Sequence, residues 1–155
     1  ADTPQPKVDA DPVTKPKPGS EPEADKSPAQ TADAAPVAAL KKLDTRITQN
    51  EQGEVIEVDL GGTKVTDAGL VHLKGLTKLR TLGLGSTKIT DAGLVHLKGL
   101  TSLQTLGLPS QITDAGLVHL KGLTKLQSLG LLGTQVTDAG VANLKKSLPN
   151  CEISK

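Results

Sequence analysis

Leucines recur after residue 54 in two alternating spacings. An L-x-x-L-x-L spacing places apolar side chains on one face of a short strand, and leucines three residues apart share one side of a short helix. The strand positions are Val55, Val58, Leu60, Leu79, Leu82, Leu84, Leu103, Leu106, Leu108, Leu126, Leu129 and Leu131. The helix positions are Leu70, Leu73, Leu76, Leu94, Leu97, Leu100, Leu117, Leu120 and Leu123. The pattern predicts short strands alternating with short helices.

A Thr-Asp-Ala-Gly motif marks one point in every repeat. It begins at Thr66, Thr90, Thr113 and Thr137, so the sequence repeats every 23 or 24 residues. Each threonine stands where a helix needs an N-cap, and the aspartate after it faces the positive end of the helix dipole. A single repeat buries its apolar edge only against its neighbours. We therefore expect an α/β fold, a right-handed leucine-rich repeat solenoid of about four coils, with parallel concave strands and short convex helices.

Four segments of the chain differ in pattern. Residues 1–35 hold most of the prolines and almost no large apolar residues, which predicts a disordered tail or linker. Residues 36–54 read as an N-terminal cap, a short helix followed by a hairpin. Residues 55–150 contain the four repeats, and residues 151–155 form a C-terminal cap strand. An uncapped solenoid would expose its core, so both caps are expected on physical grounds.

The third repeat is one residue short, because Leu108-Pro109-Ser110-Gln111-Ile112 replaces the six residues found in the second. We expect a local irregularity around Pro109. The other repeats carry a turn threonine at this place, and we expect these to bond between neighbouring coils: Thr63, Thr87 and Thr134.

Composition excludes several kinds of partner. The 155 residues include no Phe, Tyr, Trp or Met, so stacking on bases or sugars and aromatic anchoring in an interface have no side chains to use. The formal charge is +1, and the basic residues are spread by the repeat instead of being clustered, which argues against nucleic acid. No apolar run is long enough to insert in a membrane. We expect a monomer.

Two columns of polar residues suggest catalysis or metal binding at first sight. His72, His96 and His119 occupy one repeat position, yet helices packed side by side lie too far apart for successive histidines to share a metal. We interpret them as surface-exposed residues. The aspartate of each Thr-Asp-Ala-Gly motif is explained by its place at a helix start, and one carboxylate per coil does not make a calcium loop. The sequence therefore predicts no enzyme, no metal site and no cofactor.

These motifs resemble those of the bacterial leucine-rich repeat proteins with T-D-x-G-L-x-x-L repeats, which are abundant in planctomycetes and often end in L-P-N-C-x-I, as Leu148 to Ile153 does here. The units also resemble the cysteine-containing repeat subtype of eukaryotic F-box proteins. The resemblance covers residues 54–153 and implies protein interaction as the general activity. It carries no catalytic residues. A ubiquitin-ligase-type adaptor would need an F-box, and no such segment precedes these repeats.

The expected binding surface is the concave face, where outward residues alternate with buried leucines. We predict that a protein or extended peptide binds there weakly. The candidate contact residues are Glu57, Asp59, Thr81, Thr105, Ser128 and Leu132. Pro109 is expected to point outward on the same face. A stripe of lysines on the convex helices is interpreted as a solvated face: Lys74, Lys98, Lys121 and Lys145.

Three alternatives stay open. In the first, the array is a structural spacer without a specific ligand. The two more remote ones are a ubiquitin-ligase-type substrate adaptor and a metal-assisted hydrolase at the histidine column. The chain begins at Ala1, and its start is rich in Pro, Ala, Asp and Lys. From this we expect a processed, exported protein that is periplasmic or attached to the cell envelope, a lipoprotein being one form, with a cytoplasmic location as the alternative.

Overall fold

The computed structural model describes residues 34–155. The expected tail of residues 1–35 lies outside this range except for its last two residues. Helix α1 (Ala34–Lys41) is followed by strand β1 (Arg46–Gln49) and then by a series of strands and short helices. The strands are β2 (Val55–Asp59), β3 (Thr81–Gly83), β4 (Thr105–Gly107), β5 (Ser128–Gly130) and β6 (Glu152–Ser154).

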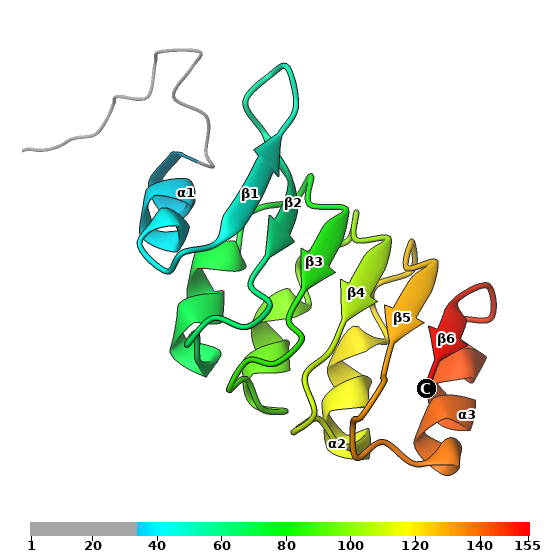
Figure 1. Ribbon diagram of the computed structural model, residues 1–155. Helices are drawn as coiled ribbons and strands as arrows, with labels where there is room; N and C mark the ends of the chain where they lie inside the picture. Colours follow the sequence, from blue (N-terminus) through cyan, green and yellow to red (C-terminus); the bar gives the residue numbers. More distant parts are fainter. Residues whose placement is uncertain (1–33) are drawn as a thin grey trace, which may run out of the picture. The chain divides into compact units, whose positions relative to one another are not determined.

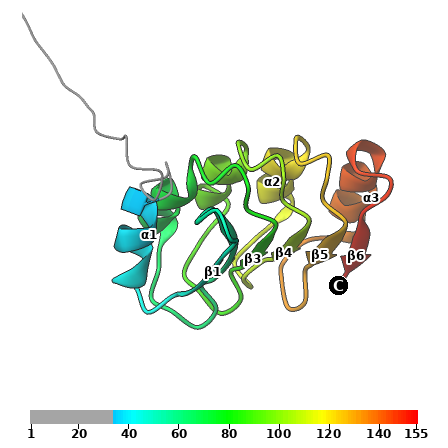
Figure 2. The same ribbon diagram turned by 90° about the horizontal axis from the view of Figure 1, so that it is seen from above.

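The six strands form one sheet in the order in which they occur in the sequence. β1 pairs with β2 antiparallel, and every later pair is parallel. Figure 1 shows the strands side by side, with β2, β3, β4 and β5 each followed by a helix behind the sheet, and Figure 2 shows the helices along one side and the strands along the other. We call the side lined by strands the sheet face and the opposite side the helix face.

The helices differ in type. The leucine spacing distinguishes the last helix from the first three, whose segments 66–77, 90–101 and 113–124 are identical in sequence. η2 (Asp67–Leu73) and η3 (Gly93–Leu97) are 3₁₀-helices, while the third unit starts as α2 (Asp114–Leu117) and continues as η4 (Val118–Leu120). A 3₁₀-helix has three residues per turn, so leucines exactly three apart all face the core in it. In the last unit Val141, Leu144 and Leu148 are spaced by three and four, and this segment is the ten-residue α-helix α3 (Asp138–Ser147).

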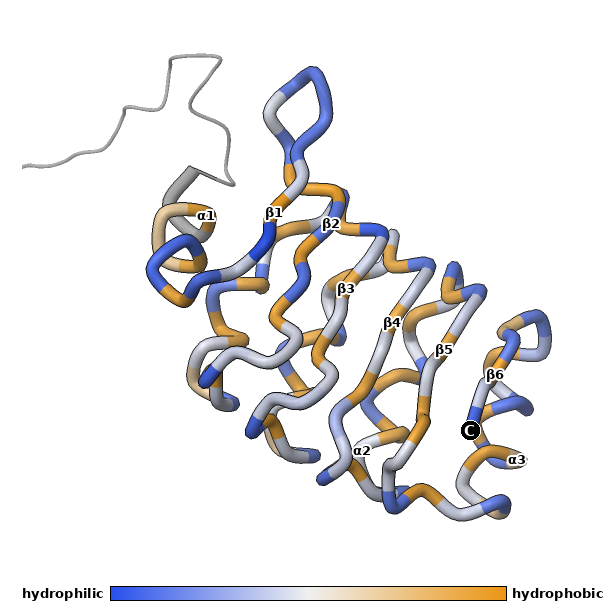
Figure 3. Tube along the Cα trace, in the orientation of Figure 1, coloured by the Kyte–Doolittle hydropathy of each residue, from blue (hydrophilic) through white to orange (hydrophobic). Residues whose placement is uncertain are grey.

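The core is a continuous row of leucines between the strands and the helices. Every strand-position and helix-position residue predicted to be apolar is buried. Figure 3 shows these apolar positions recurring around each unit, while the loop between β1 and β2 is hydrophilic. At the two ends Val37 and Leu40 of α1, and Leu148 and Cys151 before β6, are buried in the same core. Burial of this apolar surface is the main force that joins the units.

Main-chain hydrogen bonds also join the units just beyond the strands. Leu60, Leu84, Leu108 and Leu131 each donate from the backbone amide to a carbonyl of the following unit, at 2.7 to 3.0 Å. The shortened third unit keeps this bond, and its strand stays in register with both neighbours. Its deletion is therefore absorbed in the turn that follows the strand.

The turn around Pro109 differs from the other three, as predicted. In the other units the turn contains a residue with positive φ, namely Gly62, Ser86 or Gly133, with φ of 75°, 59° and 77°. The third unit has no positive-φ residue between Leu108 and Ile112, and the Ile112 amide donates to the Pro109 carbonyl instead. The residue missing from the third unit is therefore the one that has the left-handed backbone conformation in the other units. Residues other than glycine, such as Ser86, adopt this conformation at a cost in free energy.

Two expectations about this edge were wrong. The turn threonines do not bond between units, because each hydroxyl donates within its own unit to the leucine carbonyl three residues earlier, at 2.7 Å. Pro109 does not point outward, because it is buried. A proline has no amide hydrogen, so this buried position has no backbone donor to satisfy.

Candidate functional site

The sheet face carries a continuous row of polar residues. Glu57 pairs with Thr81, Thr81 with Thr105, and Thr105 with Ser128 in the strand register. The row ends at Glu152 of β6, which pairs with Ser128. Four of the six residues predicted from the sequence therefore lie in one line across the strands. Hydroxyl groups occupy the middle of this line, and an exposed carboxylate stands at each end of its parallel strands. Beyond Glu57, the exposed Thr48 of β1 continues the row.

Sequence reasoning missed Glu152. It was treated only as part of a terminal cap strand, although the repeat spacing places it in register with Ser128. The signal that would have found it is the alignment of Cys151-Glu152-Ile153 with Gln127-Ser128-Leu129. With Glu152 included, the row is acidic at both ends and not only at the first strand.

Beside this row lies a second row made almost entirely of glycine. Asp59 pairs with Gly83, Gly83 with Gly107, and Gly107 with Gly130. Three successive strands therefore carry no side chain of their own along this line, although the Asp59 carboxylate lies close to Gly83. At Gly107 and Gly130 no side chain lies within 4 Å of the Cβ position, which leaves room for another backbone to approach the sheet closely.

Asp59 is already engaged within the protein. Its Oδ1 accepts a hydrogen bond of 2.9 Å from the Gly61 amide, and its Oδ2 lies 4.0 Å from the guanidinium of Arg46 on β1. It also lines a surface cavity of about 500 Å³ together with Asp44, Thr45, Arg46 and Gly61. Asp59 therefore contributes to the acidic end of the sheet face through a partly neutralised carboxylate, whereas Glu57 is exposed.

Leu132 lies outside both rows. It follows β5 in the turn, and its side chain is 81% exposed. The sheet register does not bring it next to Ser128, so the structure separates it from the line of the other candidates.

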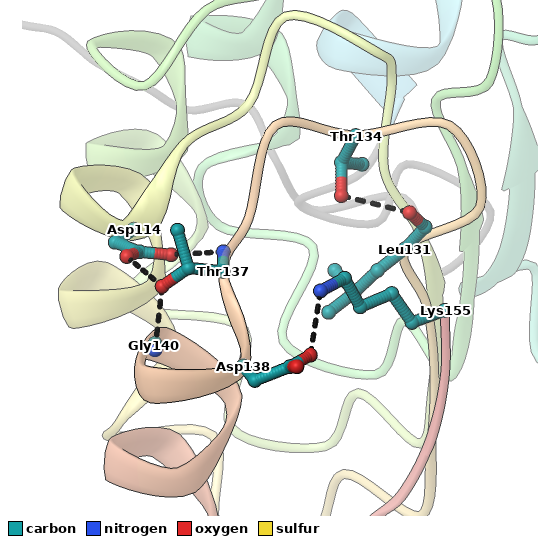
Figure 4. Close-up of polar contacts among 7 residues, drawn as sticks. All are labelled: Asp114, Leu131, Thr134, Thr137, Asp138, Gly140 and Lys155. Carbon is teal, nitrogen blue, oxygen red and sulfur yellow. Dashed lines mark hydrogen bonds and ion pairs between the residues drawn. The ribbon is translucent and has the colours of Figure 1, made fainter.

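The aspartate column forms bridges between neighbouring units. Asp67, Asp91 and Asp114 each accept two hydrogen bonds from the threonine that begins the next motif, one from its amide and one from its hydroxyl, at 2.5 to 2.8 Å. We call each such pair an Asp–Thr bridge. Figure 4 shows the last one, Asp114 to Thr137. The carboxylates are therefore structural, and the interpretation that a helix start explains them fully was wrong.

The glycine of the motif belongs to the same bridge. A Cβ atom placed on Gly93, Gly116 or Gly140 would come closer than 3.0 Å to the Oδ1 of the preceding unit's aspartate. Only a glycine leaves room for that carboxylate. The Thr-Asp-Ala-Gly motif thus encodes a contact between units, with the aspartate on one side and the threonine and glycine on the other.

The predicted capping by threonine is found in only part of the array. Thr113 accepts from the Ala115 amide and Thr137 from the Gly140 amide. Thr66 makes no side-chain cap bond, and η3 begins after Ala92 rather than after Thr90. The two true caps belong to the units that start as α-helix, where the N-terminal amides are positioned to donate to a side chain.

Titration shifts follow these contacts. Hydrogen bonds from the Thr137 hydroxyl and amide lower the pKa of Asp114, and the ion pair with Lys155, at 2.7 Å, lowers the pKa of Asp138. Desolvation by burial raises the pKa of the Cys151 thiol, which is therefore not activated as a nucleophile.

The histidine column is half-buried, not fully exposed as predicted. In His96 and His119 the Nδ1 atom is buried and has no hydrogen-bond partner within residues 34–155. Over the same residues no group of three or more His, Cys, Asp or Glu side chains is arranged to hold a metal ion, and no helix is both long and apolar enough to cross a membrane.

Comparison with known proteins bears on the repeat itself. Residues 75–98 match the family model described as Leucine Rich repeat. The predicted leucine-rich repeat is confirmed by this match. No curated protein matches the chain.

Several solved structures are similar to it. One is the crystal structure of PEPR1-AtPEP1, with 16% identity, 70% of this chain and 19% of that chain covered, and a TM-score of 0.37. Another is an internalin (inlF) from Listeria monocytogenes, with 18% identity, 79% and 55% covered, and a TM-score of 0.29. The chain spans about a fifth of the first structure's length and just over half of the second's.

Proposed function

We propose that this protein is a non-enzymatic interaction module, a right-handed solenoid of about four leucine-rich repeat coils with a capped N-terminus, that binds an extended segment of a partner across its sheet face. The observation that carries the proposal is the line from Glu57 through Thr81, Thr105 and Ser128 to Glu152. The leucine-rich repeat at residues 75–98 supports an interaction role.

The spacing of the line defines the ligand. Neighbouring strands lie about 4.8 Å apart, so the two terminal carboxylates, four strands apart, are roughly 19 Å from each other. An extended peptide advances about 3.3 Å per residue, so roughly six residues span this distance. The matching partner is an extended segment with a basic side chain at each end and small or polar residues between them.

The middle of the line favours a close but weak contact. The hydroxyls of Thr81, Thr105 and Ser128 both donate and accept hydrogen bonds, and the glycine row beside them admits the partner's backbone. No aromatic residue or arginine stands in the line to anchor a partner, and such residues usually supply most of an interface's binding energy. We therefore expect affinity that depends on the two carboxylates and falls with added salt.

A titration with a labelled peptide tests the proposal. The probe is a short peptide with one lysine at each end and alternating serine and glycine between them, and binding is followed by fluorescence anisotropy. We expect Glu57→Gln and Glu152→Gln each to weaken binding by about fivefold, as for a charge-assisted contact worth about 1 kcal/mol.

Glu51→Gln is the matched control, because Glu51 is an exposed acid in the hairpin loop, away from the line. It should leave binding unchanged. Equal losses of affinity in all three variants would show that the peptide responds only to the net charge of the protein. This result would refute the proposal that the peptide binds along the line from Glu57 to Glu152.

A structural spacer without a specific ligand is the second candidate. The segments 70–77, 94–101 and 117–124 are identical in sequence, which is what recent duplication produces before surfaces diverge. A specific ligand stabilises the folded state by mass action. If neither the basic probe nor its variants raise the melting temperature at saturating concentration, the spacer role is favoured.

We also propose that the protein acts outside the cytoplasm, in the periplasm or at the cell envelope of a bacterium. The composition of residues 1–35 supports this, since a Pro-, Ala- and Lys-rich spacer suits a domain held away from a surface. Fractionation of producing cells, with the protein detected in each fraction, tests the location. Recovery only with cytoplasmic markers would contradict it.

A further inference from the structure

The helix face carries an exposed apolar column that the sequence analysis did not identify. Four large apolar side chains are exposed among residues 37–155, and three of them occupy one repeat position. These are Val71, Val95 and Val118, which are 41%, 40% and 52% exposed. An exposed alanine precedes each valine by three residues, at Ala68, Ala92 and Ala115, and so lies one helical turn before it.

A row of lysines runs beside the valines. Lys74, Lys98 and Lys121 each follow a valine by three residues, and all three are exposed. The ion pairs within residues 34–155 join Arg46 to Asp59, Lys78 to Glu54 and Lys155 to Asp138, so none of them neutralises this row.

The acidic residues of the same helices form no ion pair with this row. The carboxylates of Asp67, Asp91 and Asp114 lie at the helix starts, where neutral threonine groups donate to them in the Asp–Thr bridges. The helix face therefore presents apolar side chains next to lysines that form no ion pair in the described chain.

A cavity opens at the end of this column, between η4 and α3. It has a volume of about 120 Å³ and is lined on one side by Asp114, Val118 and Lys121 and on the other by Ala139, Gly140 and Asn143. The Asp114 carboxylate in this lining accepts the hydrogen bonds of Thr137. The last unit has Ala142 and Asn143 where the earlier units have valine and histidine. The volume equals that of about four water molecules, which is the size of one aliphatic side chain.

We propose that the helix face binds an acidic segment of a partner protein, with an aliphatic side chain seated in the cavity beside Val118 and carboxylates paired with Lys98, Lys121 and Lys145. Charge complementarity selects this occupant. A second copy of the chain would bring a basic row against a basic row, and the face has no aromatic residue to anchor in a membrane interface.

Fluorescence anisotropy with a short peptide of glutamates and leucines tests the proposal on the full chain. A peptide with serine in place of leucine reports the charge contribution alone, and one with lysine in place of glutamate should not bind. We expect Val118→Ser and Lys121→Glu each to weaken binding of the glutamate–leucine peptide by about tenfold. Asn143→Leu fills the cavity and should weaken it without removing a charge.

Lys88→Glu is the matched control, because Lys88 is an exposed lysine in the turn after β3 and lies outside the column. It should leave binding within twofold of the original, and every variant should keep the melting temperature of the unmodified chain. Equal losses in Lys88→Glu and Lys121→Glu would overturn the proposal, and so would a serine peptide that binds as tightly as the leucine one. Association of the chain with itself through Val118, seen by sedimentation, would also overturn it.

This proposal and the one for the sheet face fail separately. Glu57→Gln and Glu152→Gln should not affect the acidic peptide, and Lys121→Glu should not affect the basic one. A chain that binds neither peptide refutes both.

Discussion

The sheet face and the helix face join the same four units by different means. On the sheet face the units are joined by main-chain hydrogen bonds of a parallel sheet, which need no particular side chain. On the helix face they are joined by the Asp–Thr bridges, which need an aspartate, a threonine and a glycine at fixed places. The outward positions of the line from Glu57 to Glu152 are thus free to vary without loss of the fold, whereas Gly83 is constrained by the Asp59 carboxylate beside it.

This difference explains where a ligand is expected and where the sequence is constrained. Substitutions in the Thr-Asp-Ala-Gly motif should lower the free energy of unfolding, whereas substitutions in the line from Glu57 to Glu152 should change binding and leave stability alone. The column of Val71, Val95 and Val118 is the exception on the helix face, because those residues take no part in the bridges and are exposed.

The largest expected effect on stability comes from Gly116→Ala. The added Cβ would overlap the Asp91 carboxylate and also approach Leu94, so either the bridge breaks or the helix shifts. We expect a loss of about 3 kcal/mol in the free energy of unfolding, measured by urea denaturation. Gly122→Ala is the control, because nothing lies within 4 Å of the position of its Cβ. If both variants lose the same amount, the crowding argument is wrong.

The next effect comes from Asp91→Ala, which removes both acceptors of Thr113. We expect a loss of about 2 kcal/mol, as for hydrogen bonds to a charged group. Asp138→Ala is the matched control from the last unit, where the aspartate has no following motif and its carboxylate pairs with Lys155 at the exposed surface. This variant should change the urea midpoint little, and a comparable shift in both would count against a special role for the bridges.

The stability supplied by Asp114 should depend on pH. Hydrogen bonds from Thr137 lower its pKa in the folded protein below the ordinary value of 3.8, so the bridge contributes fully above that value. Its contribution is lost as the pH falls through the lowered pKa of the folded state. The gap in melting temperature between the unmodified protein and Asp114→Asn should therefore be widest near neutral pH and shrink in acid. A gap that grows in acid would reverse the sign of this linkage.

The smallest effect is expected on the sheet face. Thr105 is exposed, and its strand position is held by main-chain bonds. Thr105→Ala should change the free energy of unfolding by less than about 0.5 kcal/mol, as is usual for a surface substitution. A loss comparable to that of Asp91→Ala would erase the proposed difference between the two faces.

Much of this fold follows from spacing alone. The alternation of leucine positions predicts every strand from β2 to β5 and every helix after α1, because each apolar set has only one way to face a shared core. The spacing of exactly three in Leu94, Leu97 and Leu100 suits a 3₁₀-helix, but the identical segment of the third unit begins as the α-helix α2, so spacing alone does not determine the helix type there. In α3 the spacing of three and four selects the α-helix instead.

Contacts between units could not be derived from the sequence. Both the turn threonines and the motif threonines recur once per unit in most units. Yet the turn threonine Thr87 forms a hydrogen bond within its own unit, whereas the motif threonine Thr113 forms one with the preceding unit. Which of these occurs depends on how far one unit is displaced against the next, and no single repeat encodes that distance. Glu152 differs from these threonines, because the repeat spacing already aligns it with Ser128 and the sequence was sufficient to place it.

One variant tests the central claim, which is that the outward residues of the line from Glu57 to Glu152 bind the partner and do not contribute to the stability of the fold. It combines Glu57→Gln, Thr105→Ala and Glu152→Gln, and its melting temperature and its affinity for the lysine-ended peptide are measured on the same sample. The account predicts an unchanged melting temperature and a loss of peptide binding. Retained binding, or a fall in melting temperature as large as that of Asp91→Ala, would contradict it.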